Sequence, residues 1–489
     1  MANIQELREA RIEKLNKLKQ AGIDPYPAKS SRTHLIKDAV DGFDSLSKKQ
    51  SEIILSGRIR SIRGHGGAVF MNIEDVSGKF QIFFKKDIIG EEQHKLIKLL
   101  DIGDFIEVTG KLFLTQKEEK TLEVSDWKIL TKSLRPIPEE WFGLKDEEQK
   151  LRKRYLDILS NPDIKEMFCK KSIFWNAIRE FLVKKDFLEV ETPVLETTTG
   201  GADARPFVTH HNTLDIDVFL RISGGELWQK RLLVAGFEKT FEIGRIFRNE
   251  GMDAEHLQDY TQMEVYWAYA DYKDMMKLVE DMYKYVIKKT FGKTQFKIRG
   301  FDVDFNKEWE TYDFVEIVKK DTGIDILNVD LEEIKNKLKE LKIEYDKNGF
   351  NITRGIDNLW KYCRKKLSGP GFVINVPVEI SPLAKKDSDN TKLVQRFWPI
   401  IAGSELGNGF SELNDPVDQA ERFSGQTKLR EAGDEEAQMN DEDFVEALEY
   451  GMPPAAGFGV SERLFAFLMD KPVRECQIFP LMRPVNKTD

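Results

Sequence analysis

Residues 241–272, FEIGRIFRNEGMDAEHLQDYTQMEVYWAYADY, decide how the rest of the chain is interpreted. The pattern predicts two strands joined by a charged loop. Side chains of one parity emerge on one face of a strand. One face would therefore carry Glu242, Gly244, Ile246, Arg248 and Glu250 of the first strand with Tyr260, Gln262, Glu264, Tyr266 and Ala268 of the second. With His256 in the loop, this face suits a triphosphate, because guanidinium matches phosphate oxygens bidentately. The alternative is a surface hairpin with solvated charges.

The same stretch carries a resemblance to a known family. Phe247-Arg248-Asn249-Glu250-Gly251, then His256, Tyr260-Thr261, Glu264 and Tyr266, resembles motif 2 of class II aminoacyl-tRNA synthetases in their bacterial-type lysyl form. The resemblance extends over nearly the whole chain. It implies an α+β protein, with an N-terminal OB-fold β-barrel and a catalytic domain built on an antiparallel β-sheet flanked by helices.

The expected domains follow from changes of pattern along the chain. They are an N-terminal helical extension (1–50), an OB-fold anticodon-binding domain (51–133), a linker or hinge (134–162) and a catalytic domain (163–489) with a helical insertion at about 325–370. At 489 residues the chain can bury at least two cores. Its net charge of −9 does not by itself indicate a nucleic-acid partner. It does not exclude one either, because nucleic-acid binding needs only a local basic face.

Cysteine usage and hydropathy bear on the compartment. The three cysteines, Cys169, Cys363 and Cys476, match no metal-ligand spacing, so we expect reduced thiols. The N-terminus is charged rather than apolar, and no run approaches a membrane-spanning length. A cytoplasmic protein with no membrane partner is therefore expected.

Short alternating strands between residues 51 and 133 predict the barrel. Such barrels bind single strands by stacking bases on aromatic rings. Phe70, Phe83 and Gln81 are candidates, with core packing as the alternative for the two phenylalanines. The resemblance implies that Phe70 and Gln81 contact the tRNA anticodon. Lys120-Thr121 stands where the family usually has Gly-Glu, so a third, glutamate contact is not expected there.

The segments before residue 241 supply further parts of the resemblance. A helix over 164–185 and the following strand correspond to motif 1, which implies a homodimer through these two elements; the alternative is a helix packed on a sheet edge. In the loop 197–207, Gly201 would offer its carbonyl to the α-amino group of the substrate. Glu226 would bind the same amine, and Gly224-Gly225 replaces the usual Ala-Pro before it.

Residues 404–415, SELGNGFSELND, hold three further candidates. The resemblance makes Glu405 a magnesium and ATP ligand, assigns Asn408 to the substrate carboxylate, and assigns Glu412 to the side-chain ammonium. Asn408 and Glu412 share strand parity but Glu405 does not, so a break at the glycines 407 and 409 is required. Trp398 stands where the family usually has a metal-binding glutamate. We therefore expect fewer bound magnesium ions, or weaker binding of one of them.

Residues 453–468 resemble motif 3, with a glycine run one residue short and Arg463 as its nucleotide-binding arginine. The resemblance then implies ATP-dependent activation of L-lysine and its transfer to tRNA(Lys). Arg248 would be the catalytic residue. The implied ATP ligands are Arg248, Glu250, His256, Tyr260, Glu405 and Arg463, and the implied lysine ligands are Gly201, Glu226, Glu264, Tyr266, Asn408 and Glu412.

Three alternatives remain at this point. The first is an aspartyl- or asparaginyl-type enzyme, against which the carboxylate Glu412 argues, because an acidic substrate needs an arginine there. The second is a paralogue that lysylates a protein, although such paralogues resemble only the catalytic half. The third is an RNA-binding protein with a decayed catalytic domain, to which Trp398 and the shortened glycine run point.

Overall fold

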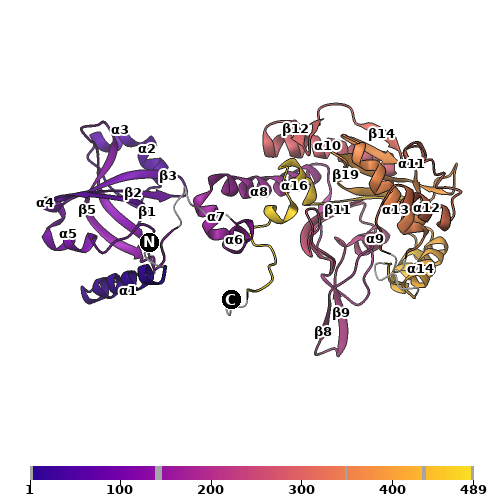
Figure 1. The fold of residues 1–489 in the computed structure, drawn as a ribbon, viewed down its shortest axis with the longest axis horizontal. Helices are drawn as coiled ribbons and strands as arrows, with labels where there is room; N and C mark the ends of the chain where they lie inside the picture. Colours follow the sequence, from indigo (N-terminus) through magenta and orange to yellow (C-terminus); the bar gives the residue numbers. More distant parts are fainter. Residues whose placement is uncertain (1–3, 138–145, 347–349, 432–436, 486–489) are drawn as a thin grey trace. The chain divides into compact units, whose positions relative to one another are not determined.

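The computed structural model describes residues 4–137, 146–346, 350–431 and 437–485. The chain forms two compact units, Met1–Ser160 and Asn161–Asp489 (Figure 1). Of the expected linker, residues 138–145 lie outside the described residues; its later part forms helices α6 (Glu147–Arg152) and α7 (Arg154–Ser160).

The first unit contains a closed five-stranded barrel, which confirms the predicted OB-fold. Its strands are β1 (Glu52–His65), β2 (Ala68–Asp75), β3 (Gly78–Lys85), β4 (Phe105–Leu114) and β5 (Lys120–Thr131), in the order β1-β2-β3-β5-β4. Helices α4 (Lys86–Ile89) and α5 (Glu91–Ile97) connect β3 to β4. Alternate residues such as Leu55, Ile82 and Val108 are fully buried in the barrel interior.

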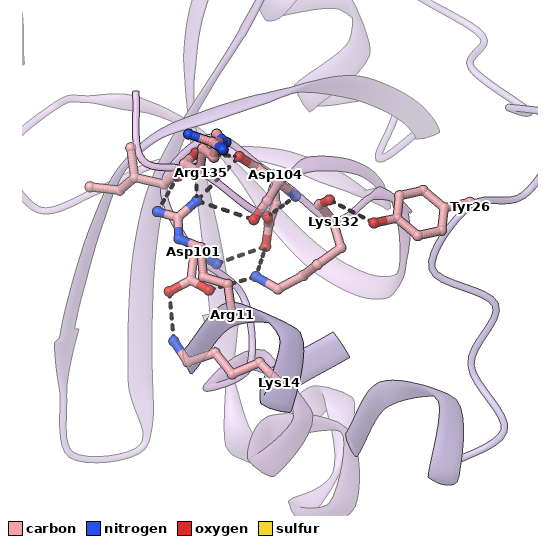
Figure 2. A network of polar contacts seen from close by, with 9 residues as sticks. Arg11, Lys14, Tyr26, Asp101, Asp104, Lys132 and Arg135 are labelled. Atoms are coloured by element: carbon pink, nitrogen blue, oxygen red, sulfur yellow. Dashed lines mark hydrogen bonds and ion pairs between the residues drawn. The ribbon is translucent and has the colours of Figure 1, made fainter. Parts of the chain in front are cut away.

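The N-terminal helix α1 (Ile4–Gln20) lies in the expected helical extension and is held against the barrel by ion pairs (Figure 2). The Lys132 ammonium lies 2.5 Å from Asp101 Oδ2 and 2.8 Å from Asp104 Oδ2, and Lys14 of the helix reaches Asp101 Oδ1 at 2.6 Å. Arg11 donates to the carbonyl oxygens of Ser133 and Arg135. Two short helices, α2 (Ile36–Asp41) and α3 (Phe43–Lys48), precede β1.

The second unit is organised by a mostly antiparallel sheet in the order β14-β15-β18-β20-β21-β11-β10-β6, with β19 paired to β18. The strands are β14 (Glu310–Asp313), β15 (Gly371–Ile374), β18 (Arg396–Ile401), β19 (Ser404–Glu405), β20 (Asn408–Ser411), β21 (Ala455–Ser461), β11 (Asp259–Ala268), β10 (Lys239–Phe247) and β6 (Leu188–Glu189). Only the outermost pairs, β14 with β15 and β10 with β6, are parallel. The predicted hairpin 241–272 is thus β10 and β11, near one edge.

Two cores cover the two faces of this sheet. On one face, Met263 and Val265 of β11 pack with helices α8 (Pro162–Val183), α10 (Tyr272–Phe291) and α16 (Arg463–Leu468). On the other, Tyr266 of β11 packs in a core supplied by helices α9 (Glu226–Val234), α11 (Phe314–Thr322), α12 (Leu331–Glu340), α13 (Ile352–Cys363), α14 (Pro416–Glu431) and α15 (Glu442–Glu449). The predicted helix 164–185 corresponds to α8.

Smaller elements complete the second unit. Strands β7 (Leu195–Glu196), β8 (Val208–His211) and β9 (Ile216–Leu220) form a small sheet whose β8–β9 hairpin projects from the unit (Figure 1). Two further strand pairs are β12 (Gln295–Ile298) with β13 (Phe301–Asp304), and β16 (Val376–Pro377) with β17 (Leu393–Val394). Over the described residues, no helix has both the length and the apolar character needed to cross a membrane.

Candidate functional site

A cavity of about 400 Å³ opens on the face of the sheet that carries Tyr266. This volume lies within the usual range of small-molecule sites. Twelve predicted residues of the second unit line it together: Gly201, Glu226, Arg248, Glu250, His256, Tyr260, Glu264, Tyr266, Glu405, Asn408, Glu412 and Arg463. They come from segments more than 250 residues apart in the sequence. The structure therefore brings all of them into one site.

The hairpin that motivated the prediction contributes through its open end. Strand β10 ends at Phe247, so Arg248 extends beyond the strand, where its Nε donates to Ile222 O at 3.2 Å. Its guanidinium carbon lies 5.8 Å from the centre of the Tyr260 ring. Glu242 differs from the expected arrangement. It shares the face, but a buried ion pair of 2.5 Å with Arg221 covers it, and it does not line the cavity.

Three buried carboxylates meet in the deepest part of the cavity. The Lys230 ammonium lies 2.8 Å from Glu226 Oε1 and 2.5 Å from Glu412 Oε2. Glu264 accepts hydrogen bonds from the Gly224 backbone N–H at 2.7 Å and from the Tyr266 hydroxyl at 2.9 Å. Glu412 Oε1 is buried, and no hydrogen-bond donor contacts it among the described residues. The pocket thus holds three carboxylates and one ammonium, an arrangement that favours the binding of a further cation.

Burial changes the acidity of these groups. Loss of hydration raises the pKa of Glu264 to about 7, with repulsion from Glu226 as the next cause. Burial likewise raises the pKa of Glu412 to about 8, although the nearby Lys230 ammonium opposes the shift. A carboxylate taken out of water holds its proton more tightly unless a cation replaces the lost hydration. Perturbed carboxylates in a cavity are typical of functional sites.

Two glycines make room for this pocket. Gly201 has φ +86, and a Cβ there would lie 2.6 Å from Ser223 Oγ and 2.9 Å from Glu226 Cβ. Gly457 lies in β21 between Tyr266 of β11 and Phe410 of β20. A Cβ at Gly457 would overlap Glu412 Oε1 and lie 2.6 Å from the Tyr266 ring. The glycine run of β21 therefore forms an open floor beneath the acidic side chains.

The segment 404–415 contains the predicted break. Strand β19 ends at Glu405 and β20 begins at Asn408; between them Gly407 has φ +147, a conformation that favours glycine. The break lets Glu405 line the same cavity as Asn408 although their parities differ. Glu405 Oε1 accepts a hydrogen bond from the indole N–H of Trp360, and its side chain is 30% exposed.

The other end of the cavity holds the cationic residues. Arg463 pairs with Glu255 at 2.6 Å, and Arg299 pairs with the same carboxylate. His256 is half-exposed, with Nδ1 2.8 Å from Asp253 Oδ2. Arg463 and His256 are thus each held by an acidic neighbour.

The chain is similar to known proteins over nearly its whole length. Residues 146–483 match the family described as tRNA synthetases class II (D, K and N), and residues 53–130 match the OB-fold nucleic acid binding domain. The chain is 46% identical to lysine–tRNA ligases of Thermoanaerobacter pseudethanolicus, over 99% of this chain and 97% of the relative, and of Carboxydothermus hydrogenoformans, over 98% and 99%. It is 43% identical to that of Thermosipho africanus, over 99% and 97%. The chain belongs to the class II lysine–tRNA ligases.

The family implies a magnesium ion, and the donor set of this class II synthetase can be tested against it. Within the described ranges, no group of three or more His, Cys, Asp or Glu side chains could hold a metal. Magnesium is usually bound through one or two carboxylates together with substrate phosphates and water. Glu405, partly exposed and lining the cavity, fits such an ion arriving with a nucleotide.

The two predicted anticodon residues of the barrel, Phe70 and Gln81, differ in their burial and contacts. Phe70 is half-buried and stacks on Phe83 with ring centres 4.5 Å apart, beside Phe113 at 6.1 Å from Phe83. Gln81 is buried, and its amide donates to Thr121 Oγ1 at 2.9 Å. The aromatic face agrees with base stacking. An anticodon contact by Gln81 remains a prediction.

Several residues that shape the synthetase site were missed by sequence reasoning. They are Lys230, Arg396, Trp360 and, on helix α13 of the expected insertion, the cavity-lining Thr353, Arg354 and Asp357. One signal was available for Lys230: it follows Glu226 by four residues, a spacing that pairs opposite charges on a helix such as α9. The other residues reach the cavity through tertiary contacts that no local pattern records.

Proposed function

We propose that this chain is a lysine–tRNA ligase that joins L-lysine to ATP as lysyl-adenylate, releases pyrophosphate, and transfers the lysine to the 3′-terminal adenosine of tRNA(Lys). The observation that carries the proposal is the charge of the deep pocket. Three buried carboxylates face one buried ammonium, and lysine brings two further ammonium groups. A buried carboxylate without a cation costs about 3–5 kcal/mol, so neutral or acidic side chains are rejected by hundreds-fold or more.

Lysine would be held at three points. Glu412 and the Tyr266 hydroxyl, with Glu264 behind it, receive the side-chain ammonium. Glu226 and the Gly201 carbonyl receive the α-amino group in the same pocket. Asn408 receives the carboxylate, which leaves the reacting end of lysine toward Arg248.

ATP would occupy the cationic end of the cavity. Tyr260 stacks on adenine, and Glu250 contacts its amino edge. His256 and Arg463 hold the outer phosphates, releasing their acidic neighbours Asp253 and Glu255. Arg248 binds the lysine carboxylate and the α-phosphate together and stabilises the charge that develops as the carboxylate attacks phosphorus and pyrophosphate leaves.

Glu405 would hold magnesium together with ATP oxygens. When bound, the ion neutralises charge on the phosphates. Trp360 donates to Oε1 of Glu405, so Oε2 would be the oxygen that holds the ion. Trp398 supplies no carboxylate, so we infer fewer protein ligands for magnesium than the family usually provides.

The remaining parts of the proposal concern tRNA and the dimer. Residues 51–133 would read the anticodon through Phe70 and Gln81, and residues 163–489 would perform the chemistry. A homodimer would form through α8 and β6, supported by the exposed apolar side chains Ile173, Val183 and Leu188 and by the edge position of β6. Sedimentation equilibrium tests it; a purely monomeric chain at micromolar concentration would reject the dimer.

Amino-acid-dependent ATP–pyrophosphate exchange tests the function. We expect exchange with lysine and none with aspartate or asparagine. Arg248→Ala should abolish it, while Arg245→Ala, an arginine of the same hairpin outside the cavity, should retain most of it. Near-normal exchange in Arg248→Ala, with the fold intact by circular dichroism, would reject the assignment of Arg248.

A further inference from the structure

The carboxamide of Asn408 is held by two donors on the same atom. Asn408 Oδ1 accepts a hydrogen bond from Arg396 Nε at 2.8 Å and from the Trp398 indole Nε1 at 2.9 Å. Guanidinium and indole nitrogens only donate hydrogen bonds, so neither can face an amide nitrogen. The two contacts therefore fix which end of the carboxamide is oxygen.

This arrangement leaves the amide nitrogen facing the cavity. Asn408 lines the cavity, and among the described residues no acceptor contacts its Nδ2. The terminal torsion of asparagine is broad and roughly two-fold, so an unrestrained carboxamide could present either end. Turned by half a rotation, it would present oxygen to an anionic carboxylate and repel it. The donors on Oδ1 remove that alternative.

Trp398 is itself held firmly. The pairs Arg396–Phe410 and Phe397–Gly409 set an antiparallel register that brings Trp398 opposite Asn408. Its ring packs against Phe314 and Trp360 with centres 5.8 and 6.0 Å away, and the Arg396 guanidinium lies 4.8 Å from the ring centre.

Arg396 is anchored in turn. Its Nη1 donates to Ile380 O at 2.6 Å and Ser381 Oγ at 2.8 Å. The donors to Asn408 thus belong to a rigid cluster rather than to mobile side chains.

We propose that Trp398 is a positioning residue for lysine, which together with Arg396 locks the Asn408 carboxamide so that Nδ2 donates to the substrate carboxylate. The inference rests on the proposed function, which assigns Asn408 to that carboxylate. It also gives Trp398 a role in place of the metal-binding carboxylate expected at this position. Its effect falls on one part of the ligand, the carboxylate, and on no other.

The experiment compares two ligands in the full-length protein. L-lysine carries the carboxylate; cadaverine (1,5-diaminopentane) is lysine without it. Trp398→Phe removes the indole N–H, and Trp309→Phe is the matched control, because Trp309 is equally buried and its N–H contacts no acceptor among the described residues. Dissociation constants for both ligands are measured by calorimetry, and thermal unfolding is recorded for each variant.

We expect Trp398→Phe to raise the dissociation constant of lysine about tenfold, which corresponds to the loss of one hydrogen bond. The dissociation constant of cadaverine should change less than twofold. Trp309→Phe should leave the ratio of the two constants unchanged. Replacement of Trp398 by benzothienylalanine, which exchanges N–H for sulfur at nearly constant volume, should reproduce the loss without a packing defect. Trp398→Phe combined with Asn408→Ala should be no worse for lysine than Asn408→Ala alone.

The outcomes separate the two levels of the argument. Equal weakening of lysine and cadaverine by Trp398→Phe, or no weakening by benzothienylalanine, would overturn the positioning role and leave only packing. If Asn408→Ala itself leaves the lysine-to-cadaverine ratio unchanged, the assignment of Asn408 in the proposed function fails instead. Loss of the ratio in Asn408→Ala but not in Trp398→Phe overturns the inference alone.

Discussion

The ammonium of Lys230 lies 2.5 Å from the carboxylate of Glu412, with side-chain exposures of 1% and 0%. The same ammonium bonds Glu226 on the preceding helical turn. Lys230 is thus an internal counter-ion for the acidic pocket, which can still bind a second cation. Because buried charges are tolerated only when paired, it keeps the acidic cluster folded while the substrate is absent.

Lys230→Met should therefore destabilise the second unit. Removing one partner of a buried pair costs about 3–5 kcal/mol. The loss should be smaller at pH 6 than at pH 8, because an orphaned Glu412 can take up a proton at the lower pH. Denaturant unfolding at the two pH values measures this, with Lys170→Met, which breaks an exposed pair with Glu166, as the control. An equal loss at both pH values would contradict the counter-ion role.

Lysine binding should depend on pH and release protons. The raised pKa values of Glu264, about 7, and Glu412, about 8, mean that the empty pocket holds protons near neutrality, whereas the ammonium binds the ionised form. Affinity should rise between pH 6.5 and 8.5, by up to tenfold per pH unit for each proton released. Calorimetry in two buffers of different ionisation enthalpy counts the protons. A dissociation constant that is flat over this range would exclude the linkage.

The same shifts have a consequence for the empty protein. A carboxyl group whose pKa is raised on folding binds its proton more tightly in the folded state. Its stabilising contribution is complete below the unfolded pKa of about 4.3 and is lost as pH rises toward 7–8. Saturating lysine supplies the missing cation, so it should flatten this decline in Tm with pH.

Gly457→Ala should impair lysine binding more than folding. Its added methyl would overlap Glu412 Oε1 and crowd Tyr266. Overpacking costs about 1–3 kcal/mol, which corresponds to a roughly ten- to hundredfold rise in KM for lysine. Gly425→Ala in helix α14 is the control, since a Cβ there meets no atom within 4 Å and alanine favours helix. An unchanged KM for lysine in Gly457→Ala would show that β21 does not form the pocket floor.

The fold was predictable where a local pattern repeats. Alternation over residues 51–133 indicated the barrel, and the expected N-terminal helical extension contains helix α1 over residues 4–20. Side-chain parity also placed Tyr260, Gln262, Glu264 and Tyr266 of β11 on one cavity wall. Glu242 had the same parity yet lies outside the cavity, because Arg221 from another segment covers it.

The residues that line the site were predictable, and the residues that support them were not. All twelve residues drawn from motif resemblance line the cavity, but the groups that orient them come from elsewhere in the fold. Trp360 reaches Glu405 from helix α13, an insertion to which no chemistry was assigned. Trp398 was interpreted only as a missing carboxylate, since the hydrogen bond of its indole depends on the register of β18 with β20.

Lys132→Met tests whether the buried ion pairs hold helix α1 against the barrel of the first unit. Lys132 and Asp104 are both fully buried, and Asp101 links them to Lys14 of the N-terminal helix (Figure 2). Although burial alone would raise it, hydrogen bonds from Lys132 and Lys14 lower the pKa of Asp101. Replacing Lys132 leaves two carboxylates without their shared cation. We expect a loss of about 3–5 kcal/mol in the stability of this unit and exposure of helix α1 to proteolysis.

The same variant, Lys132→Met, should affect pyrophosphate exchange and aminoacylation of tRNA to different extents. The residues proposed for adenylation lie in the second unit, so lysine-dependent pyrophosphate exchange should stay within twofold of the parent. Aminoacylation of tRNA, for which we propose that the barrel reads the anticodon, should fall. Lys37→Met is the matched control, because its pair with Asp41 is exposed on both sides and such surface pairs contribute little to stability. If Lys132→Met left the stability of the barrel and the protection of α1 unchanged, the buried network would have no fastening role. If exchange fell together with aminoacylation, the separation of the two activities between the units would be wrong.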